Sequence, residues 1–309
     1  MKKSMIDTRR SKRNVSPEVQ QYLQASLSQS TRRAYTTDIA QFLQWGGRIP
    51  AAPERLATYL AQQAEKLSYA TLCRRVVAIG RAHTVKQLPS PSDSEIVKST
   101  MQGIRRTKGV SQRRVAPVLL HDVRNMVRKL IGIRGARDKA LLLMGFAGAF
   151  RRSELVAICV QDVQLVAEGM VIRLRRGKTD QGGAGRDIAV PYMRGSCCPV
   201  KAVVAWLAMS GITGGALFRR VDRYGHITGA GLTPQSVALI VKERAEAVGL
   251  DAQQLSGHSL RAGFVTSASQ CGASSWKIRQ QTGHRSEAGV HRYIRDSQLF
   301  TDNPLGNIR

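Results

Sequence analysis

The chain has 309 residues, of which 48 are lysine or arginine and 21 are aspartate or glutamate, and its formal charge is +27. Residues 1–114 carry 21 basic and 7 acidic side chains, and residues 115–309 carry 27 and 14, so a basic tail on a neutral domain explains the excess poorly. A polyanionic partner such as nucleic acid explains it better, and both halves are expected to contact phosphate. The length favours two domains.

The sequence argues against a membrane, secreted or metal-dependent protein. The longest apolar run, Ala140 to Phe150, is too short to span a bilayer. The polar amino terminus lacks the apolar core of a secretory signal, so we expect a cytoplasmic protein. The five cysteines show no C-x-x-C spacing, so we interpret them as buried or incidental thiols, and we expect no metal or other cofactor.

The amino-terminal half is predicted to be helical after a basic, flexible leader over residues 1–15. Ser16-Pro17-Glu18 is typical of a helix start, because proline suits the first helical position. Thr31 is placed to cap a helix. Its predicted apolar face comprises Tyr35, Ile39, Phe42 and Leu43, and Asp38 lies off that face. Further helices are predicted over residues 53–65, 68–84 and 92–106. Together these helices define a domain over residues 16–106.

A basic linker over residues 107–116 lacks apolar periodicity and marks the boundary to a second domain, residues 117–309. Two helices are predicted to follow the linker, and the chain from Pro199 onward is expected to be helical again. Between them, β-branched stretches predict a small antiparallel sheet. The ranges are 119–131 and 134–146 for the helices, and 156–160, 169–174 and 186–190 for the strands. The predicted fold class is therefore mainly α with a small antiparallel β-sheet.

A tyrosine, two histidines and two arginines are the residues that could carry chemistry. Tyr293 follows His284 by nine residues and has basic neighbours. His258 and Arg261 are three residues apart, so on a helix both side chains project from one face and can meet the same phosphate. Arg151 opens the segment Arg151-Arg152-Ser153-Glu154, where an ion pair with the glutamate is the plain structural interpretation. Each signal is weak alone, and the weight comes from the set.

Taken together, these segments resemble the tyrosine recombinase (phage integrase) family. The order Arg, His-x-x-Arg, His and Tyr, the wide gap between the two arginine segments and the nine-residue step to the tyrosine are similar to that family's signature. The resemblance covers residues 117–309 closely, and residues 16–106 only in kind, as the family's helical, SAM-like core-binding domain. It implies a two-domain, C-shaped clamp on DNA.

The resemblance also implies a nucleophile and its support. Tyr293 would attack the scissile phosphate to form a 3′-phosphotyrosyl bond. A free phenol has a pKa near ~10, so it needs neighbouring cations and a proton acceptor, for which His258 is the candidate. Arg151 and Arg261 would clamp the non-bridging oxygens with paired donors, and His284 would add a further hydrogen bond.

Two further residues have supporting roles by the same resemblance. Lys178, in a turn between two predicted strands, would protonate the leaving 5′-oxygen. Glu154 would fix the arginine region from behind. Other basic residues are candidates for DNA contacts outside the active site: Arg32, Arg33, Arg74, Arg75, Arg105, Arg106, Lys108, Arg113 and Arg114.

The expected function is recombination between specific double-stranded DNA sites, with strand exchange through a Holliday junction. The resemblance implies a homotetramer on DNA whose C-terminal segments exchange between protomers, with accessory DNA-bending proteins as further partners. Two alternatives remain open at this point. A type IB topoisomerase uses similar residues but relaxes supercoils, and a non-enzymatic, basic DNA-binding regulator would keep Tyr293 as a core residue.

Overall fold

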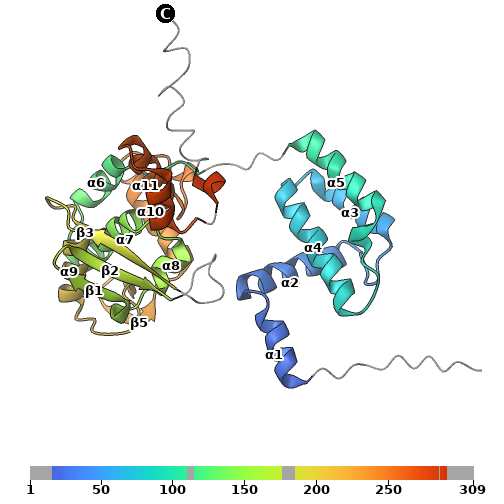
Figure 1. Cartoon of the computed structure of the whole chain (residues 1–309), viewed down its shortest axis with the longest axis horizontal. Helices are drawn as coiled ribbons and strands as arrows, with labels where there is room; N and C mark the ends of the chain where they lie inside the picture. The colour runs from blue at the N-terminus through green and yellow to red at the C-terminus, as the bar shows by residue number, and fades with distance from the viewer. Residues whose placement is uncertain (1–15, 110–114, 176–184, 285, 291–309) are drawn as a thin grey trace, which may run out of the picture. The chain divides into compact units, whose positions relative to one another are not determined.

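The computed structural model describes residues 16–109, 115–175, 185–284 and 286–290, and the chain divides into two compact units at residues 113 and 114 (Figure 1). Both units are built mainly from helices, and the second also contains two small antiparallel sheets. The predicted fold class is therefore confirmed. None of the helices in the described ranges is long and apolar enough to cross a membrane.

The first unit packs its helices around a core that includes the fully buried Phe42, Tyr59 and Leu72. Its helices are α1 (Pro17–Ala25), α2 (Gln29–Gln44), α3 (Pro53–Ala64), α4 (Tyr69–Val85) and α5 (Glu95–Lys108), with the 3-10 helix η1 (Pro91–Asp93) before α5. Serine hydroxyls cap three of these helices by accepting a backbone N–H in the first turn, as at Ser16 and Ser68.

Three details of α2 differ from the sequence prediction. Ser28, not Thr31, is the N-cap, and its hydroxyl accepts the backbone N–H of Thr31 at 3.2 Å. Leu43, predicted on the apolar face, is 47% exposed, whereas Asp38, predicted off it, is 1% exposed. The carboxylate of Asp38 is buried because it pairs with arginines of α4, a tertiary contact that helical periodicity does not report.

The second unit is organised around α7, whose residues 140–144 are all buried. Its helices are α6 (Leu120–Arg128), α7 (Gly132–Ala147), α8 (Arg152–Ala157), α9 (Pro199–Ser210), α10 (Pro234–Glu246), α11 (Ser259–Gln270) and α12 (Ser275–Thr282), with 3-10 helices η2 (Val160–Asp162) and η3 (Ala252–Gln254). The core side chains of α7 meet those of α9 and of the sheet in one cluster, in which Trp206 is fully buried and donates its indole N–H to the Leu217 carbonyl at 2.8 Å.

The three-stranded sheet has the order β1 (Val163–Val166), β2 (Gly169–Leu174), β3 (Arg186–Pro191), with both pairs antiparallel. Ile172 lies opposite Val163 on one side and Ile188 on the other, and both isoleucines are buried. At the far end of the β2–β3 pair, Leu174 lies opposite Arg186. The pairing therefore fixes Arg186 at the point where the chain returns to the sheet.

One strand prediction and one helix prediction fail in this unit. Residues 156–160 are not a strand, because they hold the end of α8, one isolated bridge and the start of η2. The Glu154 carboxylate caps the start of α8 and favours helix there. The hairpin β4 (Arg219–Val221) and β5 (Ile227–Gly231) lies in a region predicted to be helical. Its turn is closed by Asp222, whose Oδ1 accepts the backbone N–H groups of Tyr224 and His226 at 2.8 and 2.9 Å.

Candidate active site

The turn after α7 delivers Arg151 and a carbonyl group to the site. α7 ends at Ala147, and the fully buried Ala149 has a φ of +49°, an uncommon backbone conformation for a residue with a side chain. The ring of Phe150 covers Gly148 so closely that a Cβ there would lie 2.0 Å from it. The close packing of Gly148 and Phe150, the two neighbours of Ala149, therefore holds this buried turn. The next residue, Arg151, is the N-cap of α8.

Glu154 holds Arg151 by two hydrogen bonds. The backbone N–H of Arg151 donates to Glu154 Oε2 at 2.9 Å, and its Nη1 donates to Oε1 at 2.5 Å. The glutamate side chain is 2% exposed and that of Arg151 is 12% exposed. A buried carboxylate with two donors fixes both the start of α8 and the direction of the guanidinium. The contact that forms the Arg151–Glu154 ion pair is thus also the contact by which Glu154 can fix the arginine, as the resemblance implies.

Arg261 joins the Arg151 turn from α11. The side chain is buried, and its Nη1 donates to the carbonyl oxygen of Ala149 at 2.7 Å. His258 is the N-cap residue of α11, three positions before Arg261, and is exposed. Gly257 permits a second contact between the two segments, because a Cβ there would lie 1.9 Å from Arg152 Cδ. Two sequence segments more than a hundred residues apart therefore meet at the same place.

His284 completes the group that the structure describes. Arg261 Nη2 lies 3.2 Å from His284 Nε2, and since a guanidinium can only donate, Nε2 accepts. The proton therefore sits on Nδ1, which donates to Thr282 Oγ1 at 2.7 Å, and the threonine hydroxyl donates in turn to the Ile278 carbonyl at 2.7 Å. This chain of hydrogen bonds fixes the ring in one neutral tautomer.

The surroundings of His284 are strongly positive. Burial, followed by the charges of four arginines, lowers the pKa of His284 to about 4; the arginines are Arg261, Arg151, Arg186 and Arg279. An imidazole that stays neutral amid this many cations marks a region of positive potential. Such a region suits an anion with several oxygen acceptors, which the geometry of the arginines can clamp.

The structure also shows two polar residues of the site that sequence reasoning missed. Arg186 donates to carbonyls at the end of α12, and Gln281 Nε2 donates to the Ala147 carbonyl at 3.0 Å and the Ala189 carbonyl at 3.1 Å. Gln281 thereby ties the end of α12 to the end of α7 and to β3. No local pattern marks either residue, because their partners are backbone carbonyls supplied by the tertiary fold.

Several predicted site residues lie outside the described residues. Tyr293 and Lys178 are among them, as are Arg113 and Arg114 of the linker region. The four described members of the predicted catalytic set are Arg151, His258, Arg261 and His284. They lie on three sequence segments, and the structure brings the segments of Arg261 and His284 together with the Arg151 turn. Hydrogen bonds join Arg261 to His284 and to the Arg151 turn, and His258 is the N-cap residue of the helix that carries Arg261.

The candidate DNA contacts of the first unit divide into surface and buried residues. Arg32, Arg33, Arg105, Arg106 and Lys108 are exposed. Arg74 is half-exposed and donates Nε and Nη2 to Asp38 at 2.7 and 3.0 Å.

Arg75 is a correction to that set of candidates, because it is 5% exposed. Its Nε lies 3.7 Å from Asp38 Oδ1, and its Nη groups donate to Tyr59, Gln63 and Gln41. A guanidinium held inside the unit by these partners does not reach a phosphate, so Arg75 serves the core of the first unit.

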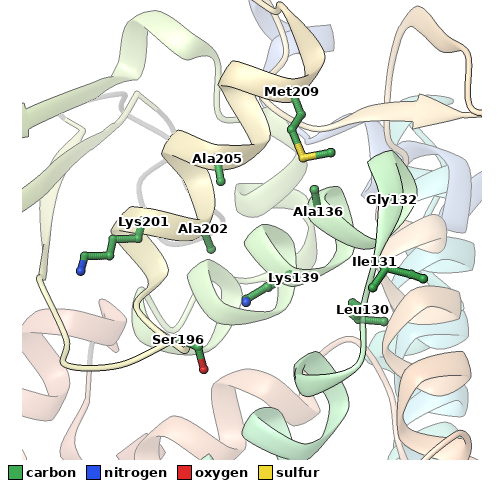
Figure 2. Close-up of a pocket in the computed structure, with 10 residues that line it drawn as sticks. All are labelled: Leu130, Ile131, Gly132, Ala136, Lys139, Ser196, Lys201, Ala202, Ala205 and Met209. Carbon is green, nitrogen blue, oxygen red and sulfur yellow. The ribbon is translucent and has the colours of Figure 1, made fainter.

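In the part of the chain that the structure describes, neither a metal-binding cluster nor the apolar cavity between α7 and α9 coincides with this group of residues. Within the described ranges, no three His, Cys, Asp or Glu residues are grouped to hold a metal ion. A cavity of about 310 Å³ between α7 and α9 has a mainly apolar lining, with Ala136 and Lys139 on α7 and Lys201 and Met209 among the residues on α9 (Figure 2). None of the arginines around His284 lines it.

Fold and site together define a mainly helical protein whose second unit holds an arginine and histidine site suited to an anion. Comparison with known proteins identifies the class. The sequence profile of the phage integrase family matches residues 101–299. The "Integrase/recombinase xerD homolog" of Selenomonas ruminantium is 38% identical over 298 residues, which cover 93% of this chain and 87% of the relative. The "Recombinase cre" of Escherichia phage P1 is 27% identical over 80% of this chain and 77% of its own.

Solved structures share the fold. XerH bound to a palindromic difH substrate in a post-cleavage complex aligns with a TM-score of 0.65 at 17% identity, over 86% of this chain and 76% of that one. A λ integrase(75–356) dimer bound to a COC′ core site aligns with a TM-score of 0.64 at 14% identity, over 93% and 96%. The chain belongs to the phage integrase family, and it is a site-specific recombinase of the tyrosine type.

Proposed function

We propose that the chain cuts and rejoins DNA strands at specific sites through a 3′-phosphotyrosyl intermediate, with Tyr293 as the nucleophile. The observation that carries the proposal is the meeting of Arg151, Arg261 and His284 in one positive, partly buried group within a tyrosine recombinase. Tyr293 follows this group by nine residues in sequence. The phosphotyrosyl ester keeps the energy of the phosphodiester, so rejoining needs no external energy source.

The roles of the clamp follow from donor geometry. Arg151, directed by Glu154, and Arg261, directed by the Ala149 carbonyl, each present paired donors for the non-bridging oxygens of the scissile phosphate. Their charge stabilises the extra negative charge of the phosphorane as it forms. Both guanidinium groups are held in place before DNA arrives, so little reorganisation is required in the transition state.

His284 changes its role when the phosphate enters. In the free protein its Nε2 accepts from Arg261, so that nitrogen carries no proton. An anion beside the ring offsets the arginines that lower its pKa, and the protonated ring then donates from Nε2 to a phosphate oxygen. His258, exposed at the start of α11, accepts the phenolic proton of Tyr293, and Lys178 protonates the leaving 5′-oxygen.

The larger assembly is proposed from the family and from the DNA that the relatives bind. XerH and λ integrase were solved with their recombination sites, which supports double-stranded DNA sites as the substrate here. We assign residues 16–106 to core binding and residues 117–309 to catalysis on the same duplex. Four copies, joined by exchanged C-terminal segments, would process two duplexes through a Holliday junction, with DNA-bending proteins assisting at some sites.

A covalent adduct on a nicked suicide duplex tests the chemistry. The duplex is drawn from genomic DNA flanking the gene, because the target sequence must first be mapped. The parent protein is expected to accumulate an adduct at a 3′-phosphate, and Tyr293→Phe is expected to form none. If Tyr293→Phe traps as much adduct as the parent, the proposed nucleophile is wrong. A second assay separates a recombinase from a topoisomerase. Strand exchange between two short recombination sites supports a recombinase, whereas relaxation of any plasmid without strand exchange supports a topoisomerase.

A further inference from the structure

Arg186, which is not part of α12, binds the C-terminal end of that helix. It is the first residue of β3, opposite Leu174, and its side chain is 26% exposed. Nη1 donates to the carbonyls of Gln281 at 2.8 Å and Gln280 at 3.3 Å, and Nη2 donates to that of Thr282 at 3.2 Å. The last carbonyls of a helix have no partner within it and carry the negative end of its dipole, so a cation fits here. The contact fixes where α12 stops.

The same guanidinium reaches the arginine turn. Arg186 Nη2 lies 3.9 Å from Glu154 Oε2, the oxygen that accepts the backbone N–H of Arg151. Burial lowers the pKa of Arg186, and the Glu154 carboxylate opposes that shift. One buried glutamate therefore serves two arginines, and Arg186 lies between the start of α8 and the end of α12.

Gly283 brings the contact directly to His284. Its φ of +68° is a left-handed conformation that favours glycine, and a Cβ there would lie 2.8 Å from Arg186 Cζ. The guanidinium thus packs against the backbone of the residue between Thr282 and His284. These are the two residues whose side chains share the hydrogen bond that sets the histidine tautomer.

We propose that Arg186 is a positioning residue of the recombination reaction: it holds the Thr282 to His284 turn against the Arg151 and Glu154 pair, so that His284 and Arg151 face the same phosphate. This inference rests on the proposed function. It assigns Arg186 a contribution to rate that acts through its neighbours, without contact to the DNA. A cap that only stabilised α12 would leave the rate of the folded protein unchanged.

Two substitutions separate the charge of Arg186 from its geometry. Arg186→Gln removes the charge, whereas Arg186→Lys keeps it but replaces the planar fork with a single ammonium that cannot hold three carbonyls and face Glu154 together. The matched control is Arg173→Gln on β2, where an exposed arginine pairs with an exposed Asp187 at 3.1 Å. All variants are full-length, and adduct formation is measured under single turnover with the duplex saturated by protein.

We expect Arg186→Gln to slow adduct formation by about 10–100-fold, as loss of an outer supporting contact commonly does. Arg186→Lys should be slowed by less but remain slower than Arg173→Gln, and duplex affinity should fall no further in either variant than in this control. If Arg186→Gln does not fold, Arg186→Lys alone decides. A folded Arg186 variant that forms adduct at the rate of Arg173→Gln overturns the proposal.

A second measurement does not depend on activity. The imidazole proton signals of His284, assigned by comparison with His284→Gln, give its pKa in DNA-free protein. In Arg186→Lys we expect this pKa to rise from about 4 toward its ordinary value of about 6.5, because the turn loosens and the ring gains contact with solvent. An unchanged pKa in this variant contradicts the positioning role. If the parent itself forms no adduct, the proposed function fails, and this titration still tests the placement of His284.

Discussion

Both units bury arginine side chains, and Arg75 of the first unit and Arg261 of the second have different partners. In the first unit Arg75 is 5% exposed and lies beside Asp38, itself 1% exposed and bound by Arg74 as well. In the second unit Arg261 is 4% exposed, and it donates to a carbonyl and to a histidine whose pKa is lowered by burial, by Arg261 and by three further arginines. The Asp38 carboxylate offsets the charge of the two arginines beside it, whereas four arginines around a neutral imidazole leave a positive region that favours the arrival of an anion. The first arrangement stabilises the fold, and we propose that the second serves chemistry.

The largest effect is expected from breaking the first network. Asp38→Ala leaves Arg75 buried without its carboxylate, and removing one partner of a buried pair costs about 3–5 kcal/mol. Urea unfolding should show this loss for the first unit. Asp187→Ala, which breaks the exposed pair with Arg173, is the control and should cost less than about 1 kcal/mol. Equal losses in the two variants would contradict a structural role for Asp38.

The next effect is on chemistry. Arg261→Lys keeps the charge but loses the paired donors, and we expect the single-turnover rate of adduct formation to fall by about 10²–10³-fold, the usual cost of removing a donor that stabilises a transition state. Arg220→Lys changes an exposed arginine of β4 and should leave the rate near that of the parent. A loss below about tenfold in Arg261→Lys would remove Arg261 from the clamp.

The smallest effect concerns the exposed basic residues. Arg105, in the last turn of α5, is exposed, and a contact with phosphate there contributes about 0.9 to the slope of log K against log salt. Arg105→Ala should therefore make duplex binding less salt-dependent by roughly one unit of slope. Lys201→Ala, at the apolar pocket, is the control and should leave the slope unchanged. An unchanged slope in Arg105→Ala would exclude this contact.

Local spacing predicted a large part of the site. The three-residue step from Arg151 to Glu154 spans one helix turn, and the two side chains form the expected ion pair. The step from His258 to Arg261 has the same length, but His258 is exposed at the start of α11 and Arg261 is buried. The helices and two of the three predicted strands were found for the same reason, since apolar periodicity and β-branched runs are local signals. Whether the separate segments meet is a tertiary property, for which the sequence offered only the family resemblance.

The remaining features depend on contacts that no local pattern encodes. Arg186 and Gln281 bind backbone carbonyls of distant elements, and the tautomer of His284 follows from its neighbours on both sides. Arg75 looked like any basic residue on a helix, because its burial depends on Asp38 of another helix. In each case the side chain was visible in the sequence, but its partner was not.

Titration of His284 tests the central claim most directly, because it reports the charge environment of the site. The histidine should have a pKa of about 4 in the free protein, and addition of dimethyl phosphate, a diester that stays ionised throughout, should raise it, since a nearby anion favours the charged ring. Arg261→Lys should weaken that response. A pKa of about 6.5 for His284 in the free protein, or an unchanged pKa when the diester is added, would contradict an anion site built from arginines around a neutral histidine.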